Sequence, residues 1–216
     1  MKICIDAGHG GIDSGAVGFG YKEKDLTLTF AEKLYRKLSK TNDVVMTRTS
    51  DVSMSLNKRA SYANLHNCEL FVSIHINSAP NAQASGIETL VYADSGDTHA
   101  IAEAIQLRMI SATGAKNRGI KVRPELVVLK QTTMPAVLLE VGFISNQQEL
   151  LKLLDTDYQD LIINAIYNGI DGITYVEAIN ILRDNGILNS PEYWLKTVPK
   201  VQYLDTLLIN MAKRCD

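Results

Sequence analysis

Apolar and polar positions recur along the chain with two periods, and these divide it into strands and helices. Short apolar or alternating runs predict strands at residues 2–7, 43–47, 70–75, 87–92, 126–129 and 136–139. Apolar residues at helical spacing predict helices at residues 26–38, 56–65, 98–113, 147–154 and 158–169. Because strands and helices alternate, we predict an α/β fold, a mixed and mostly parallel sheet with helices on both faces.

Local signals refine some of these boundaries. Gly114 closes the helix at 98–113, and Ser145 with Gln148 fits a capping box before the helix at 147–154. Residues 115–125 are basic and contain a glycine, so we interpret them as a loop.

The pattern changes after Gly172, where only helical periodicity remains. Further helices are expected at residues 176–186 and 200–212. We therefore predict two domains, a main domain at 1–174 and a helical module at 175–216. The module holds the chain's only tryptophan, Trp194, which we interpret as a core residue rather than a ligand platform. Apolar positions on its helices allow self-association.

Composition narrows the possible partners. The chain has 216 residues and a formal net charge of −2, without a basic run, so we expect no nucleic-acid binding. No apolar run approaches the roughly 20 residues that span a bilayer, so we expect no stable membrane insertion. Met1 leads directly into a strand, and we therefore expect cytoplasmic synthesis without a signal peptide. The three cysteines show no CxxC spacing and are expected to be reduced, with Cys4 in the core.

Reactive side chains end three of the predicted strands. His9 follows the strand at 2–7, His75 ends the strand at 70–75, and Glu140 ends the strand at 136–139. Ligands bind at the carboxyl ends of strands in open α/β sheets. Since a charge is costly in an apolar run unless it has a partner, Glu140 is hard to explain structurally. We expect these residues to converge on one site.

Histidine and carboxylate are the usual ligands of catalytic zinc, which takes three protein ligands and leaves one position for water. His9, Glu23 and His75 form such a set, and Glu140 is then a general base beside the water. Other interpretations stay open from the residues alone. His9 also fits a polar loop, His75 also fits a satisfied core position, and Glu32 is a second carboxylate in the region of Glu23.

Seven segments of the chain resemble one enzyme family in their order. They are HGGIDSGA, YKEKDLTL, RASYANL, SIHINSA, GIETLVY, RGIKV and LLEVGFISN. Residues 1–171 thereby resemble the zinc-dependent N-acetylmuramoyl-L-alanine amidases of the type-3 class. The resemblance implies one zinc ion held by His9, Glu23 and His75, with Glu140 as the catalytic residue. It departs from the family pattern at Lys130, where an arginine is more usual.

The implied reaction cleaves the amide between the lactyl group of N-acetylmuramic acid and L-alanine in peptidoglycan. Without a signal peptide the chain resembles phage endolysins, which reach the wall after release through a holin. One rival is a bacterial amidase of division or sporulation. Others are a zinc peptidase of the stem peptide and a non-catalytic wall-binding protein built on an amidase fold. The segment 175–216 is itself a candidate wall-binding module. Asn77, Glu88 and Arg118 are candidate substrate-binding residues, each with an ordinary structural alternative.

Overall fold

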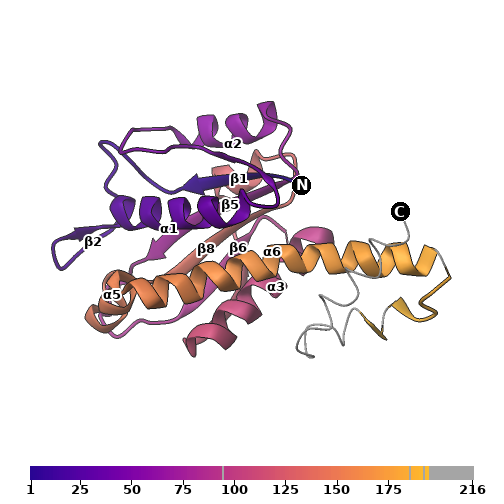
Figure 1. Ribbon diagram of the computed structural model, residues 1–216. Helices are drawn as coiled ribbons and strands as arrows, with labels where there is room; N and C mark the ends of the chain where they lie inside the picture. Colours follow the sequence, from indigo (N-terminus) through magenta and orange to yellow (C-terminus); the bar gives the residue numbers. More distant parts are fainter. Residues whose placement is uncertain (94, 185, 192, 195–216) are drawn as a thin grey trace. The chain divides into compact units, whose positions relative to one another are not determined.

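A computed structural model of the protein describes residues 1–93, 95–184, 186–191, 193 and 194. Within these residues six strands form one sheet, in the order β4-β1-β5-β8-β6-β7 (Figure 1). Their bounds are β1 Lys2–Ala7, β4 Asp43–Met46, β5 Leu70–Asn77, β6 Ile87–Val91, β7 Asn117–Val122 and β8 Ala136–Phe143. Strands β4, β1, β5 and β8 are mutually parallel, whereas β6 runs antiparallel to β8 and parallel to β7. The predicted mixed, mostly parallel sheet is confirmed.

Helices cover both faces of this sheet. On one face α1 (Glu23–Leu38) contacts β1, β4 and β5, and α3 (Gly96–Thr113) contacts β6, β7 and β8. On the other face α2 (Leu56–Leu65) contacts α4 (Val127–Lys130), and α4 contacts β8. Helix α5 (Gln147–Leu154) follows β8 and packs against it. We call the face under α2 and α4 the α2/α4 face.

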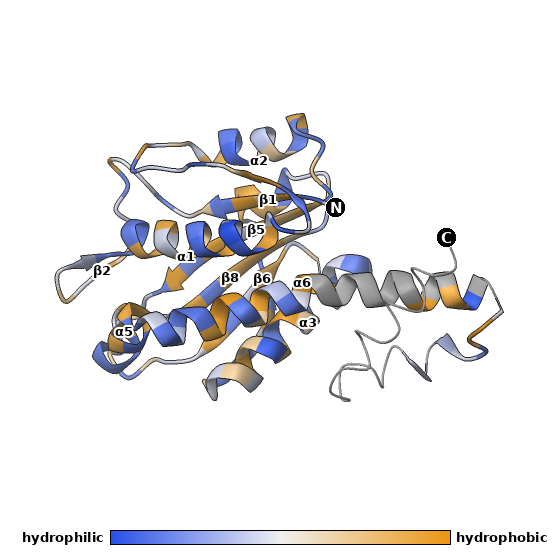
Figure 2. Cartoon of the chain, viewed as in Figure 1, coloured by the Kyte–Doolittle hydropathy of each residue, from blue (hydrophilic) through white to orange (hydrophobic). Residues whose placement is uncertain are grey.

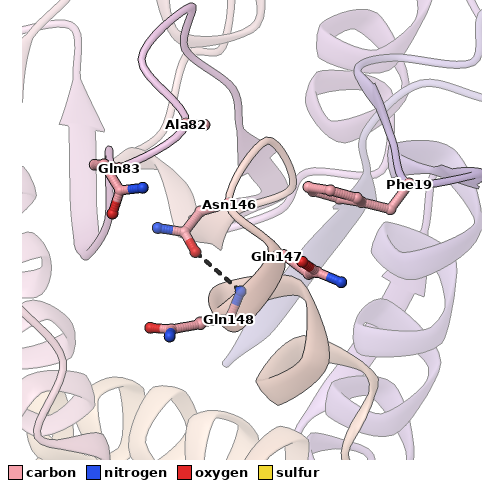
Figure 3. A pocket seen from close by; sticks show the side chains of 6 residues that line it. All are labelled: Phe19, Ala82, Gln83, Asn146, Gln147 and Gln148. Carbon is pink, nitrogen blue, oxygen red and sulfur yellow. Dashed lines mark hydrogen bonds between the residues drawn. The ribbon is translucent and has the colours of Figure 1, made fainter.

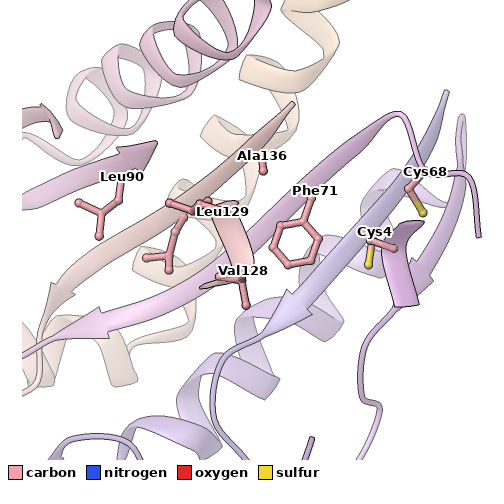
Figure 4. Close-up of a cluster of buried hydrophobic side chains, with 9 residues drawn as sticks. Cys4, Cys68, Phe71, Leu90, Val128, Leu129 and Ala136 are labelled. Carbon is pink, nitrogen blue, oxygen red and sulfur yellow. The ribbon is translucent and has the colours of Figure 1, made fainter. Parts of the chain in front are cut away.

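An apolar cluster fills the α2/α4 face (Figure 4). Cys4 pairs in register with Phe71, and Phe71 with Ala136, so the three side chains lie in one row across three strands. Other members of the cluster are Ala63, Cys68, Leu90, Val128, Leu129 and Leu138. The central strands are strongly apolar (Figure 2), and Cys4 is fully buried as predicted.

Two predicted elements are wrong. Residues 126–129 were expected to form a strand, but most of them form the short helix α4. Residues 115–125 were expected to be a loop, but they contain strand β7. A short apolar run does not by itself distinguish a strand from a buried helical turn. Strand β7 pairs only with β6 in the sheet, and its basic residues and glycine are typical of an edge strand.

The last long helix is continuous where a break was predicted. Helix α6 spans Thr156–Asp184, through the gap expected between 169 and 176. A glycine lowers helix propensity by about 1 kcal/mol but ends a helix only when a left-handed conformation follows. That conformation occurs at Gly186 (φ 70°), whose N–H bonds the carbonyl of Arg183.

The chain divides into two compact units, Met1–Tyr167 and Asn168–Asp216. The predicted domains, 1–174 and 175–216, and the wall-binding or self-association role of the second stay predictions. The helix expected at 200–212 lies outside the described residues. In the part of the chain that the structure describes, no helix is both long and apolar enough to cross a membrane.

A small hairpin interrupts the glycine-rich loop after β1. Its strands are β2 (Val17–Gly18) and β3 (Tyr21–Lys22), and the two turn residues Phe19 and Gly20 have φ of 51° and 86°. Two consecutive positive φ angles in a two-residue turn indicate type I′, which strongly favours Asn-Gly. Phenylalanine at the first position is therefore unusual, and a left-handed conformation there costs on the order of 1 kcal/mol.

Candidate active site

Polar and reactive side chains follow the apolar row of the α2/α4 face. Two residues further along the strands, Asp6 pairs with Ser73. After another two residues, His75 pairs with Glu140, and Glu140 with Glu88. Because strand residues two apart share a face, the three rows lie side by side on the same surface. Strand β6 is antiparallel to β8, so its beginning, with Glu88, reaches the same edge as the end of β5.

The structure corrects the positions of two of these residues within their strands. Glu140 was expected to end a strand at 136–139, but β8 continues to Phe143, and β5 likewise continues past His75 to Asn77. The apolar run pauses at Glu140 because this position faces the polar row, and Val141 and Phe143 are buried again. Only His9 lies beyond its strand, β1.

Glu23 is the centre of the site. It is the first residue of α1 and is buried, and its Oε1 lies 3.2 Å from His9 Nε2 and 3.0 Å from His75 Nδ1. The same oxygen accepts the N–H of Ile76 at 2.9 Å, and Oε2 accepts the N–H of Ala16 at 2.9 Å. The carboxylate is thus fixed between two histidines. Glu32, the other carboxylate considered, instead pairs with Arg36 on α1.

His9 is held in place from its other ring nitrogen. Its Nδ1 lies 2.9 Å from Asp13 Oδ2, and its backbone has a positive φ of 61°. Glycines make room around the ring: a Cβ at Gly15 would come within 2.6 Å of the His9 ring, and one at Gly8 within 2.5 Å of the His75 ring. These close contacts explain the two glycines.

The pKa values of His9 and Glu23 reflect the attraction between the histidines and the carboxylate. Burial alone would lower the pKa of His9, but hydrogen bonds and charge from Glu23 and Asp13 raise it to about 9. Burial alone would raise the pKa of Glu23, but the hydrogen bonds and charges of His75 and His9 lower it well below its usual value. The site therefore favours a positive charge between these side chains.

The same three residues are suited to a metal ion. Ligand atoms of His9, Glu23 and His75 all lie within 4.8 Å of one another. In addition, the buried Oε2 of Glu140 has no hydrogen-bond partner among the described residues. The donor set, two imidazoles and one carboxylate, matches that of catalytic zinc sites.

Glu140 differs from Glu23 in its surroundings. Glu140 as a whole is partly exposed, but burial of its carboxyl group raises its pKa to about 7. The charges of His75 and His9 oppose this rise, and the charges of Glu23 and Glu88 add to it. Two carboxylates in one site with pKa values shifted in opposite directions are typical of separate chemical roles.

Two buried arginines support the loop that bears His9. Arg59 of α2 donates to the carbonyls of Ala7 and His9, at 2.6 and 2.5 Å, and to Asp6 Oδ1 at 2.7 Å. Arg48 donates to the carbonyls of Ala7 and Gly8, each at 2.9 Å. Backbone carbonyls at the end of β1 are thereby fixed from one side.

The three candidate substrate-binding residues bond to one another. Glu88 accepts from Asn77 Nδ2 at 2.8 Å and from Arg118 Nε at 2.9 Å. The Arg118 guanidinium also lies 4.9 Å from the centre of the Phe143 ring. Glu88 is buried, whereas Arg118 and Asn77 are partly exposed.

Comparison with known proteins assigns the chain to a family. The family model for N-acetylmuramoyl-L-alanine amidase matches residues 3–172. The chain belongs to the N-acetylmuramoyl-L-alanine amidase family. It is 37% identical over 193 residues to the endolysin of Bacillus phage SPP1, covering 85% of this chain and 68% of the endolysin.

Two further relatives of this amidase chain are bacterial. N-acetylmuramoyl-L-alanine amidase LytC of Bacillus subtilis is 36% identical over 172 residues, covering 77% of this chain but 34% of LytC. A crystal structure of N-acetylmuramoyl-L-alanine amidase from Clostridium difficile 630 matches with a TM-score of 0.77 at 37% identity, covering 82% of this chain and 96% of that one. The predicted family and fold are confirmed.

The structure also adds residues that sequence reasoning missed. Asp13 orients His9, and the ion pair of Asp6 with Arg59 supports the loop that bears His9. Asp13 has a local signal, because it lies four residues after His9 in a glycine-rich turn. The pairing of Asp6 with Arg59 has none, since the two are 53 residues apart in sequence.

Asp13→Asn is expected to weaken metal binding by the candidate ligands His9, Glu23 and His75 about tenfold. A carboxylate that accepts the second N–H of a metal-binding histidine typically changes metal affinity 10- to 100-fold, and the exposure of Asp13 favours the lower value. The dissociation constant can be measured by competition with a chromophoric chelator. Asp25→Asn, an exposed carboxylate in the first turn of α1, is the matched control. Equal affinities in the two variants would contradict a supporting role for Asp13.

Proposed function

We propose that the chain hydrolyses the amide bond between the lactyl group of N-acetylmuramic acid and L-alanine in peptidoglycan. The observation on which this mainly rests is the geometry of the site in a member of this family. Ligand atoms of three side chains suited to a metal lie within 4.8 Å of one another, and on β8, beside β5, the Oε2 of Glu140 has no hydrogen-bond partner among the described residues.

We assign the metal position to His9, Glu23 and His75, and the metal to zinc. Zinc in such a set acts as a Lewis acid that polarises the scissile carbonyl and lowers the pKa of water towards about 7. Asp13 keeps the proton of His9 on Nδ1, so that Nε2 faces Glu23. The N–H groups of Ile76 and Ala16 hold the Glu23 carboxylate in its orientation.

Glu140 is the proposed general base and acid. As a carboxylate it takes a proton from the attacking water, and as a carboxylic acid it returns this proton to the departing nitrogen of L-alanine. The proton count is then restored after each turnover. The pKa of about 7 that burial gives Glu140 suits both steps near neutral pH.

Arg118 is the proposed contact for carboxyl groups of the stem peptide. Its Nε donates to Glu88 and its Nη1 lies 3.5 Å from the carbonyl oxygen of Ser85, which fixes the guanidinium over Phe143 and leaves Nη2 for a ligand. Asn77 completes this group from β5 by donating to Glu88. We assign Glu88 and Asn77 to positioning Arg118 rather than to direct contact.

The proposed biological setting is phage lysis, in which the amidase is made in the cytoplasm and reaches the wall after release. The similarity to the SPP1 endolysin extends over a larger share of this chain than that to LytC. The similarity to LytC supports a second candidate function, that of a bacterial amidase that remodels the cell wall. A holin gene beside the coding sequence would favour lysis, and a sporulation or division operon would favour remodelling.

The test of the activity is product release from purified peptidoglycan. We expect new amino-terminal alanine without new reducing sugar, a loss of release with chelator, and recovery on adding zinc. Amino termini of other residues would instead identify a stem-peptide or cross-bridge peptidase. Retained wall binding without any product would identify a non-catalytic binding module.

A further inference from the structure

A depression lies at the tip of the β2-β3 hairpin, outside the group formed by His9, Glu23 and His75. This cavity of about 260 Å³ is lined by Phe19, Ala82, Gln83, Asn146, Gln147 and Gln148 (Figure 3). None of the six lining residues is ionisable. Three of the side chains are glutamines, and the hairpin contributes an aromatic ring. The wall is therefore polar, uncharged and partly aromatic.

The walls of this cavity are anchored to the catalytic elements. The hairpin joins the His9 loop to Glu23, and a Cβ at Gly18 would come within 2.2 Å of the Ile144 carbonyl. On the other side, Asn146 Nδ2 donates to the carbonyl of Ala84 at 3.2 Å, which fixes the segment that holds Ala82 and Gln83. The cavity is thus a fixed feature beside the site.

Phe19 has no structural reason to be aromatic. It occupies the first position of a type I′ turn, where asparagine is preferred, with a φ of 51°, and its side chain is 56% exposed. A bulky residue at positive φ strains the backbone, and an exposed aromatic ring is unfavourable in water. Strained residues that the surrounding fold maintains are often found at binding sites.

The carboxamides around the ring are available to a ligand. Asn146 is occupied by capping α5, where its Oδ1 accepts the N–H groups of Gln148 and Glu149. Gln83, Gln147 and Gln148 are exposed, and within the described part of the chain their side chains make no hydrogen bond. Carboxamides both donate and accept, as hydroxyl and acetamido groups require.

We propose that this cavity is a subsite for an uncharged N-acetylated amino sugar of the glycan strand, with Phe19 against the apolar face of the sugar ring. The inference rests on the proposed function, and it adds where the glycan binds. Strand β8 ends three residues after Glu140, about 10 Å away at the usual strand rise, and the cavity residues Asn146, Gln147 and Gln148 follow that end. In this proposal the bound sugar is another unit of the glycan strand than the muramic acid that bears the scissile amide.

The charges at Arg118 and in the cavity agree with binding of the stem peptide and of the glycan at separate places. Stem peptides carry free carboxyl groups, which suit the cationic Arg118, whereas the glycan between them offers hydroxyl and acetamido groups. A cavity without ionisable walls, containing one aromatic ring and a few amides, is typical of sites for neutral polar ligands.

Phe19→Asn separates binding from stability, because asparagine suits the turn better than phenylalanine. We expect its melting temperature to be equal to or above that of the parent, while its affinity for peptide-free glycan strands falls about three- to tenfold. The strands contain no amide bond to the stem, so calorimetric titration with them does not depend on amidase activity. Tyr35→Asn, which alters another exposed aromatic (39% exposed), is the matched control, and Phe19→Tyr should restore the affinity.

Kinetics give the second readout. The ratio of kcat/KM for stem-bearing glycan strands to kcat/KM for a muramoyl dipeptide should fall three- to tenfold in Phe19→Asn. Equal glycan affinity in parent and Phe19→Asn, or an equal loss in Tyr35→Asn, would overturn the subsite. If the parent released no alanine from either substrate, the proposed function would fail, and the titration would still decide whether the cavity binds glycan.

Discussion

Glu140→Gln lowers kcat for release of amino-terminal alanine by about 10²- to 10⁴-fold, the usual contribution of a positioned general acid–base group. Glutamine has nearly the same shape as glutamate but cannot take the proton from water or return it to the leaving nitrogen. Because Glu140 Oε2 has no hydrogen-bond partner among the described residues, the substitution breaks no hydrogen bond of that atom. The fold and the zinc affinity should therefore be unchanged.

The pH profile distinguishes lost chemistry from lost structure. Burial raises the pKa of Glu140 to about 7, and the base must be ionised, so kcat/KM of the parent should fall as the pH drops through the Glu140 pKa. Bound zinc nearby shifts this midpoint below 7, since a positive charge favours the carboxylate. Glu140→Gln should lack this limb. Substantial activity with an unchanged acid limb in the variant would rule out Glu140 as the base.

Arg59→Ala is expected to lower the free energy of unfolding by about 3–5 kcal/mol, the cost of removing one partner from a buried ion pair. Asp6 is 0% exposed, and its carboxylate would lose the guanidinium while keeping only the hydroxyls of Thr47 and Ser73. The carbonyls of Ala7 and His9 would also lose a donor. The damage falls on the loop that presents His9, so zinc affinity should fall as well.

Urea denaturation with excess zinc and with chelator measures both effects. Arg36→Ala is the control, because Arg36 makes an exposed pair with Glu32, and such pairs contribute about 0–1 kcal/mol. Asp6→Asn combined with Arg59→Met should recover part of the loss, since neither partner then leaves a buried charge. A loss in Arg59→Ala no larger than in Arg36→Ala would contradict this account.

Most of the fold could be predicted because buried strands and amphipathic helices leave a periodic pattern. The failures have the same physical origin: residues 126–129 and β7 are short segments whose state depends on neighbours. Gly169 and Gly172 were interpreted as a break, but a helix without a left-handed residue continues through glycine. Segments decided by tertiary contacts do not show their state in local periodicity.

The site was partly predictable for a related reason. His9 and His75 follow apolar runs, and Glu140 interrupts one, so each is visible as a chemical exception in a regular pattern. Glu23 was a less distinct candidate, because a glutamate between two lysines also fits an exposed turn and Glu32 is a second carboxylate in the region; the family resemblance favoured Glu23. The bonds from Asn77 and Arg118 to Glu88 join three strands, and nothing in the sequence indicates such pairings.

His75, Glu140 and Glu88 lie in one in-register row across three strands. Hydrolytic activity therefore depends on the correct pairing of those strands. Successive strand residues face opposite sides, so a slip of β8 by one residue would put Leu139 or Val141 beside His75 and turn Glu140 towards α1 and α3. A misregistered chain would therefore keep the proposed metal ligands, which lie after β1, on β5 and on α1, but would lack the proposed base. In a refolding experiment on such a chain, zinc binding would recover before hydrolytic activity. The delay between the two would measure how long β8 takes to pair in the correct register.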